Sequence, residues 1–236
     1  IFEKANPKEN ATIQCISNAK QHLRSLASFT KNPNYIFNFA VDQNGANLIE
    51  YLYSIESIRL TKDVKWGLGV VTGNNKKFCH TEISPSTEAI YTGADIVSID
   101  DLKPAKRFIS PSFEQYQQVA PEKMYRAKEK LIYKFISNKL CFFYDDEQRL
   151  ILNSANMLIT AKGFPISMRQ LAFLLNSDIM NFVFRSIFST HKILRSDLES
   201  LPIFTSFFES DYELTEASLL EFLNLEESHG TYRIKK

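Results

Sequence analysis

Hydrophobic positions follow two periods along this chain, and the change from one period to the other predicts the order of its elements. Apolar residues recur at helical spacing over residues 10–30 and again over Asn47–Tyr53, which predicts two helices near the N-terminus. The stretch Trp66–Thr72 then favours a strand, with a turn at Gly73–Asn75 and a returning strand at Lys76–Thr81. The first third of the chain is therefore expected to pass from helices into a β-hairpin.

The middle of the chain carries the strongest β pattern. Residues 82–129 are interrupted by prolines, which predicts short strands and loops with one short basic helix near Pro121–Glu129. Alternating aromatic, β-branched and polar residues then run from Leu131 to Thr160, with Asp, Asn and Ser residues between the runs. This pattern predicts an antiparallel meander.

Helical spacing returns after the meander. Met168–Leu175 and Ile179–Phe188 are apolar on nearly all sides, which indicates a buried helix pair, and Ser177 is well placed as the N-cap of the second helix. A last amphipathic helix is expected over Glu216–Leu225, with Thr215 as its cap. The compact part is expected to end at Leu201–Pro202, and the tail after the last helix to be disordered.

These elements predict an α+β protein with a mixed, largely antiparallel sheet and flanking helices. We expect three segments: a helical segment over residues 1–40, a main domain over 41–205, and an acidic helix and tail over 206–236. The chain begins at Ile1 and has neither a signal segment nor an apolar run that could span a bilayer, so we expect a cytoplasmic protein, with no membrane association, cut from a larger one. Three scattered cysteines, Cys15, Cys79 and Cys141, favour reduced thiols over disulfides or a metal site.

Charge is divided unevenly. Residues 1–196 carry a formal net charge of +7, and residues 197–236 carry −6. A basic segment next to an acidic one is compatible with a polyanionic partner, and equally with two ordinary solvated surfaces.

Two motifs resemble catalytic ones. Asn32-Pro33-Asn34-Tyr35 is similar to the Asn-Pro-Pro-Tyr motif of amino-methyltransferases, but no glycine precedes Gly45, so no glycine-rich cofactor-binding turn lies upstream. We interpret the motif as a turn. Asp42 with Asp63 and Lys65 is similar to the carboxylates and lysine of Mg²⁺-dependent nucleases, but the pattern is short and degenerate. No nucleophile elbow or phosphate-binding loop is present, so we expect no catalytic, cofactor or metal site in this chain.

Residues suited to binding are better represented than catalytic motifs, because segments expected to form exposed turns and loops carry amide and cationic side chains. Asn pairs with adenine, and Lys or Arg neutralises phosphate or contacts guanine. At helical spacing, Lys123, Ala127 and Lys130 share one face. The candidate DNA-contacting residues are Asn74, Asn75, Lys76, Lys77, Lys106, Arg107, Lys123, Arg126, Lys128, Lys130, Lys134, His191, Lys192 and Arg195.

A series of short motifs follows one another from the first predicted strand to the end of the main domain: Gly67–Asn75, Tyr91–Ile96, Lys128–Phe135, Phe143–Asp145, Asn153–Asn156, Leu174–Ser177, Lys192–Arg195 and Leu201–Ile203. In this order they resemble the TaqI-like specificity domain of N6-adenine DNA methyltransferases. The resemblance covers roughly residues 40–205. Ala94 replaces the lysine usual in the family, so no role is carried to that position.

The resemblance implies a domain that selects a DNA sequence while a separate, covalently linked domain methylates adenine with S-adenosylmethionine. The parent enzyme would then be an adenine-N6 methyltransferase, possibly fused to an endonuclease. Two alternatives remain: a Mg²⁺-dependent nuclease that uses Asp42 and Asp63, and a protein-interaction module that does not bind DNA.

Overall fold

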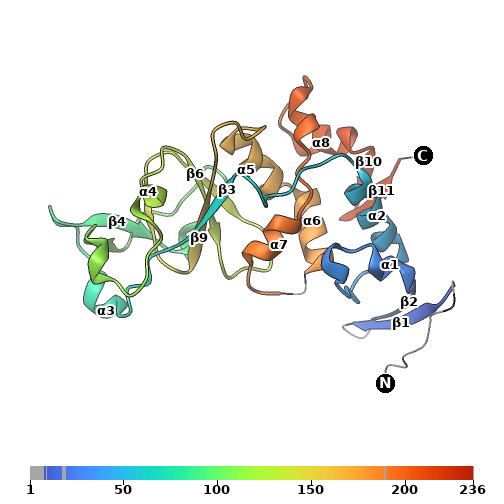
Figure 1. The fold of residues 1–236 in the computed structure, drawn as a ribbon, viewed down its shortest axis with the longest axis horizontal. Helices are drawn as coiled ribbons and strands as arrows, with labels where there is room; N and C mark the ends of the chain where they lie inside the picture. The colour runs from blue at the N-terminus through green and yellow to red at the C-terminus, as the bar shows by residue number, and fades with distance from the viewer. Residues whose placement is uncertain (1–7, 9, 18–19, 189, 236) are drawn as a thin grey trace.

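The computed structural model describes residues 8, 10–17, 20–188 and 190–235, and it divides into a β-rich half and a helix-rich half (Figure 1). The strands of the β-rich half occupy the left of the view, and most of the longer helices occupy the right. The predicted α+β class with largely antiparallel strands is confirmed.

A four-stranded antiparallel sheet forms the centre of the molecule. Its order is β3 (Val64–Leu68), β9 (Ala155–Thr160), β6 (Lys130–Lys134) and β7 (Phe142–Asp145). β6 pairs with both β7 and β9. The strand that lies between β7 and β9 in the sequence, β8 (Leu150–Ile151), does not belong to this sheet. The predicted meander is therefore wrong in its connectivity, although all of its strands exist.

β8 joins a second sheet with β4 (Glu88–Tyr91) and β5 (Phe108–Ile109), in the order β5-β4-β8. β4 and β8 are parallel, which makes the β structure mixed. The chain after β3 runs close to β8: a Cβ on Gly69 would lie only 2.2 Å from the carbonyl oxygen of Leu152. Only glycine allows this approach, and it brings the two sheets together.

Helices cover one side of the central sheet. α5 (Met168–Asn176) and α6 (Asp178–Ile187) form the predicted buried pair, and the Ser177 side chain accepts a hydrogen bond from the backbone N–H of Met180, as expected of an N-cap. They share a hydrophobic core with α2 (Gln43–Ser54) and α7 (Arg195–Ser200). A second, smaller core lies beneath β4 and β8.

The main core continues beyond Leu201–Pro202. Phe207, Leu219 and Leu225 are buried in it, so the expectation that the compact part ends at Pro202 is wrong. The last helix, α8 (Glu216–Phe222), begins after the predicted cap, Thr215. The described tail is not disordered, because β10 (Leu225–Ser228) and β11 (Thr231–Ile234) form an antiparallel hairpin.

The N-terminal prediction is wrong. Residues 10–30 do not form a helix: β1 (Thr12–Ser17) and β2 (Lys20–Ser25) pair as an antiparallel hairpin. The buried side chains Cys15 and Arg24 lie on one face of this hairpin, so a period of two also fits the segment. Short helical segments complete the fold: α1 (Ala27–Thr30), η1 (Pro33–Tyr35), α3 (Asn75–Phe78), η2 (Gly93–Asp95), η3 (Phe113–Gln115), α4 (Glu122–Tyr125) and η4 (Thr205–Glu209).

Candidate nucleic-acid interface

The turn after β3 is the best-defined candidate element. Gly73 has a φ of 75°, a conformation that favours glycine, and a Cβ there would also lie 3.1 Å from the Oε1 atom of Gln117. The chain then enters α3, so the predicted returning strand at Lys76–Thr81 is wrong. The cause is local, because the Asn74 side chain accepts a hydrogen bond from the backbone N–H of Lys77 at 3.1 Å and caps the helix.

Both amides of this turn are already used structurally. Asn74 Oδ1 caps α3, and Asn75 Oδ1 accepts a hydrogen bond from Thr72 Oγ1 at 2.5 Å. Bidentate pairing with adenine needs the amide oxygen and nitrogen together, and the bonds already made fix how each amide is oriented. Lys76 and Lys77, by contrast, are exposed.

The fold brings a second basic segment next to this turn. His80 and Phe108 exchange backbone hydrogen bonds of 2.8 and 2.9 Å as an antiparallel bridge. In this register Arg107 lies opposite Thr81 and Lys106 opposite Glu82, just beyond the end of α3. Lys106 and Arg107 are both exposed. Burial raises the pKa of the Cys79 thiol, and the charge of Arg107 partly opposes that rise. We call Lys76, Lys77, Lys106 and Arg107 the α3 cluster.

A second group of cations forms at the end of β6. Ile193 N donates to Phe135 O at 2.8 Å and Ser137 N donates to His191 O at 3.0 Å, so residues 191–193 extend β6 as an antiparallel partner. This pairing gathers Lys134, His191 and Lys192, which we call the β6 cluster. In Figure 1, α3 and the segment that leads into α7 both lie along the lower edge of the molecule.

Other candidate cations are paired within the chain. Arg126 makes a bidentate ion pair with Glu88, at 2.7 and 2.8 Å, and this bonding raises the pKa of its guanidinium. Arg195 Nε donates to Glu199 at 2.7 Å, and its guanidinium lies 6.0 Å from the centre of the Trp66 ring. Lys123 and Lys128 are exposed. The two arginines are therefore weaker candidates for phosphate contacts than the exposed lysines.

Lys130 is a wrong prediction. Helix α4 ends at Tyr125, so Lys130 does not share a helical face with Lys123 and Ala127; it begins strand β6. Its side chain is 0% exposed and pairs with the equally buried Asp145. A side chain without exposed surface does not contact a phosphate.

Two polar residues that the predicted set omits lie beside the α3 cluster. Gln118 exchanges backbone hydrogen bonds of 2.9 and 3.1 Å with Val71, and Gln117 packs against Gly73. Both glutamines are exposed, and glutamine offers the same amide pair to adenine as asparagine. The only signal in the sequence was a polar, glutamine-rich loop, whose position beside Gly73 depends on a non-local bridge.

The carboxylates proposed for a nuclease are not assembled. Asp42 Oδ1 accepts a hydrogen bond from the backbone N–H of Gly45 at 2.8 Å and caps the start of α2. Asp63 is exposed and lies in the bend just before β3. Within the part of the chain that the structure describes, no three His, Cys, Asp or Glu side chains come together as a metal site.

Asn32–Tyr35 forms a turn, as predicted. Pro33–Tyr35 is a single 3-10 turn, and Asn34 and Tyr35 have φ values of 53° and 54°. The Asn32 amide donates to Ile36 O at 2.6 Å and to Asn38 Oδ1 at 2.7 Å. Because both amide hydrogens of Asn32 bond within the turn and its side chain is buried, Asn32 serves to hold the turn together.

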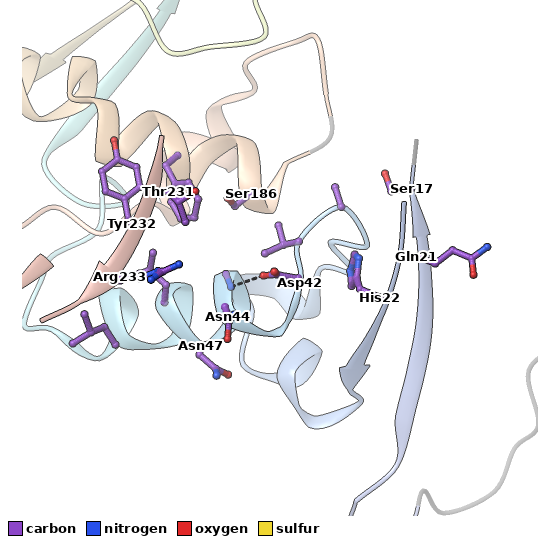
Figure 2. A pocket seen from close by; sticks show the side chains of 16 residues that line it. Ser17, Gln21, His22, Asp42, Asn44, Asn47, Ser186, Thr231, Tyr232 and Arg233 are labelled. Carbon is purple, nitrogen blue, oxygen red and sulfur yellow. Dashed lines mark hydrogen bonds between the residues drawn. The ribbon is translucent and has the colours of Figure 1, made fainter. Parts of the chain in front are cut away.

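An open cavity of about 1200 Å³ lies beside the N-terminal hairpin (Figure 2). It is lined by residues of the N-terminal hairpin, α2, α6 and β11, among them Gln21, His22, Asn47 and Arg233. None of the candidate DNA-contacting residues lines it. Among the described helices, none combines the length and the apolar character needed to cross a membrane.

Comparison with known proteins finds a matching family model and a curated relative. Residues 88–203 match the family model of the TaqI-like C-terminal specificity domain. The relative is the type II methyltransferase M.VspI of Vibrio sp. (strain 343), which is 38% identical over 96 residues. That match covers 41% of this chain and 24% of the relative, so it spans about a quarter of the relative's length. The Gly67–Asn75 segment precedes the family match.

Solved structures with a similar arrangement are distant. One is a chain from a structure of a type I R-M system, with a TM-score of 0.39 and 13% identity, covering 72% of this chain and 37% of the other. Another is the HsdS subunit from Thermoanaerobacter tengcongensis, with a TM-score of 0.41 and 12% identity, covering 75% of this chain and 41% of the other.

Proposed function

We propose that this chain recognises a short sequence in duplex DNA for a restriction–modification methyltransferase, because residues 88–203 match the family model of the TaqI-like C-terminal specificity domain. The family match is the observation that carries this proposal. In the same proposal, the methyltransferase acts on adenine N6, and S-adenosylmethionine is bound by its catalytic domain rather than by this chain.

The arrangement of charge supports DNA as the ligand. The four cations of the α3 cluster are exposed, and so are His191 and Lys192 of the β6 cluster, whereas Lys134 is partly buried. In Figure 1, α3 and the segment that leads into α7 lie along the same edge of the molecule. Phosphate contacts of this kind fix the register of a protein on the duplex, while side chains between them contact base edges. Gln117 and Gln118 lie next to the α3 cluster and are our candidates for base contacts.

Selection from a random pool of duplexes tests the proposal. The chain is incubated with duplex oligonucleotides that carry a random central segment, and the bound fraction is sequenced over several rounds. We expect enrichment of one short sequence. A bound pool that stays random would limit the chain to non-specific binding, and the absence of binding at low salt would favour the protein-interaction alternative.

Substitution of the glutamines refines the test. Gln117→Ala and Gln118→Ala remove the amides without changing charge, so we expect the enriched sequence to become degenerate at one or two positions. Gln148→Ala is the matched control, because Gln148 is exposed on the turn between β7 and β8 and belongs to neither cluster.

A further inference from the structure

Ile136 is an exposed apolar residue just after the end of β6, beside the β6 cluster. It is 64% exposed. Two backbone hydrogen bonds between residues 135–137 and residues 191–193 flank the pair Ile136–Lys192. In an antiparallel ladder this is a non-hydrogen-bonded pair, in which the two opposite side chains lie on one face and closest together. The fold therefore holds Ile136 and Lys192 side by side on a paired backbone.

Ser154 connects this region to the second sheet. Phe135 N donates to Ser154 O at 3.1 Å, and Ser154 Oγ accepts a hydrogen bond from Gly93 N at 3.0 Å. Gly93 begins η2, which follows strand β4 of the second sheet. Both sheets and the segment 191–193 are thus bonded to the backbone next to Ile136, so its position in the fold is well defined.

Three lysines lie around Ile136. Lys134 precedes it by two residues, Lys139 follows it by three, and Lys192 lies opposite it. Lys139 and Lys192 are exposed, and Lys134 is partly buried. Burial raises the pKa of the Cys141 thiol, and the charges of Lys134 and Lys139 oppose that rise, so both ammonium groups lie near Cys141. Among the ion pairs of the described residues, none involves these three lysines.

The region around Ile136 is poor in available acidic groups. Residues 131–140 and 188–196 contain no Asp or Glu. One exposed acid, Asp101, follows the loop at Val97 that contacts Cys141. The other described carboxylates of η2, this loop and α7 are engaged in hydrogen bonds or ion pairs within the chain: Asp95, Asp100, Asp197 and Glu199. Three lysines against one exposed acid leave the region positive.

The combination of one apolar side chain and several cations narrows the choice of ligand. A single exposed isoleucine is common on soluble proteins, but Ile136 differs because lysines lie around it on a paired backbone. The centre of a protein interface is poor in lysine, which disfavours a protein partner. Duplex DNA offers phosphates to the lysines and, in the major groove, one apolar group, the C5-methyl of thymine. One ligand therefore matches both kinds of side chain.

We propose that Ile136 contacts the C5-methyl group of a thymine in the major groove, while Lys134, Lys139 and Lys192 bind neighbouring phosphates. This inference rests on the proposed function and adds a requirement on the target, because the recognised sequence then contains an A·T pair opposite Ile136. A G·C pair there would turn the amino group of cytosine toward a side chain that offers it no acceptor. Ile136 thus selects thymine in addition to the amide contacts proposed above.

Deoxyuridine tests this contact, because it pairs as thymidine does but lacks the methyl group. The complete chain is titrated by fluorescence anisotropy with the duplex that carries the enriched sequence, and with duplexes in which one thymine at a time is replaced by deoxyuridine. At one position we expect the affinity of wild type to fall roughly fourfold, the effect of one buried methyl group. Ile136→Ser should bind that duplex and its thymine parent equally.

Two variants are controls for this result. Ile136→Val keeps a branched apolar side chain and should retain the preference for thymine. Leu214→Ser removes an apolar side chain that is 46% exposed in the acidic C-terminal segment, and should behave as wild type. Both positions are exposed, so we expect all variants to fold, which circular dichroism checks.

Three results would overturn the inference: an enriched sequence without thymine, a wild-type protein whose affinity no deoxyuridine changes, or a methyl effect of the same size in Ile136→Ser. Equal weakening of Ile136→Ser on all duplexes would also reject it, and would indicate a side chain inserted between base steps. The absence of any enriched sequence would reject the proposed function together with this inference, whereas the results above reject the inference alone.

Discussion

Lys130 and Asp145 form an ion pair inside the protein, and neither side chain has exposed surface. Lys130 Nζ also donates to Tyr125 O at 2.8 Å, and Arg149 reaches the second carboxylate oxygen of Asp145 at 2.8 Å. Burial lowers the pKa of Lys130, and the adjacent Asp145 opposes that change. The pair joins the end of α4 to strands β6 and β7.

Lys130→Met should therefore reduce stability. Removing one partner of a buried pair costs about 3–5 kcal/mol, because the other charge stays buried without compensation. We expect the free energy of unfolding in urea to fall by that amount, reduced by the stabilisation that Arg149 still gives to the Asp145 carboxylate. Lys128→Met is the matched control and should stay within about 0.5 kcal/mol of wild type, because Lys128 is exposed. Equal stability of the two variants would contradict this description.

Lys130 shows where the sequence was insufficient. A run of Lys and Arg between Lys123 and Lys134 predicts an exposed basic surface, because local spacing does not show which lysine meets a carboxylate from another strand. That information lies in the pairing of Lys130 with Asp145, fifteen residues away. The same limit explains the wrong meander, since β8 pairs with β4 from a distant part of the chain.

Where local signals decide the structure, the sequence was sufficient. The helix pair and the Ser177 cap follow from apolar spacing and from a serine before a helix. The hairpin at residues 12–25 could not be predicted, because its apolar residues fit both the helical period and the period of two that is typical of a strand. The α3 cluster was predicted only as separate pieces, which the His80–Phe108 bridge brings together.

Ser177→Ala should destabilise the helix pair. Ser177 Oγ accepts from Met180 N at 3.2 Å and donates to Leu174 O at 2.7 Å, so it bonds to the ends of both helices. Loss of an N-cap costs about 1 kcal/mol, within a range of roughly 0.5–2. Chemical denaturation measures this change, and Ser86→Ala, in an exposed loop, should leave the midpoint unchanged.

Glu216 should make stability depend on pH. Its carboxylate accepts the backbone N–H groups of Asp178 and Ile179 at 3.0 and 2.9 Å, while burial raises its pKa above the usual 4.5. The folded state then holds the proton at a pH where the unfolded state has lost it. Stability therefore rises as pH falls from neutral toward that raised pKa.

The matched variant for this effect is Glu216→Gln, which does not titrate. Urea unfolding at a series of pH values between 7 and 4.5 should show wild type gaining stability relative to Glu216→Gln as the pH falls. Parallel curves over this range would show that the pKa of Glu216 is the same in the folded and unfolded states.

Salt dependence of DNA binding shows whether the α3 cluster contacts phosphate. Fluorescence anisotropy of a labelled duplex, carrying the enriched sequence, gives the affinity from about 50 to 200 mM salt. Each phosphate contact that is lost lowers the slope of log affinity against log salt by about 1, so Lys76→Ala/Lys77→Ala should lower it by about 2. Lys62→Ala/Lys162→Ala is the control, because these exposed lysines flank the opposite end of the β3–β9 pair. If both double variants kept the wild-type slope, the α3 cluster would not contact DNA.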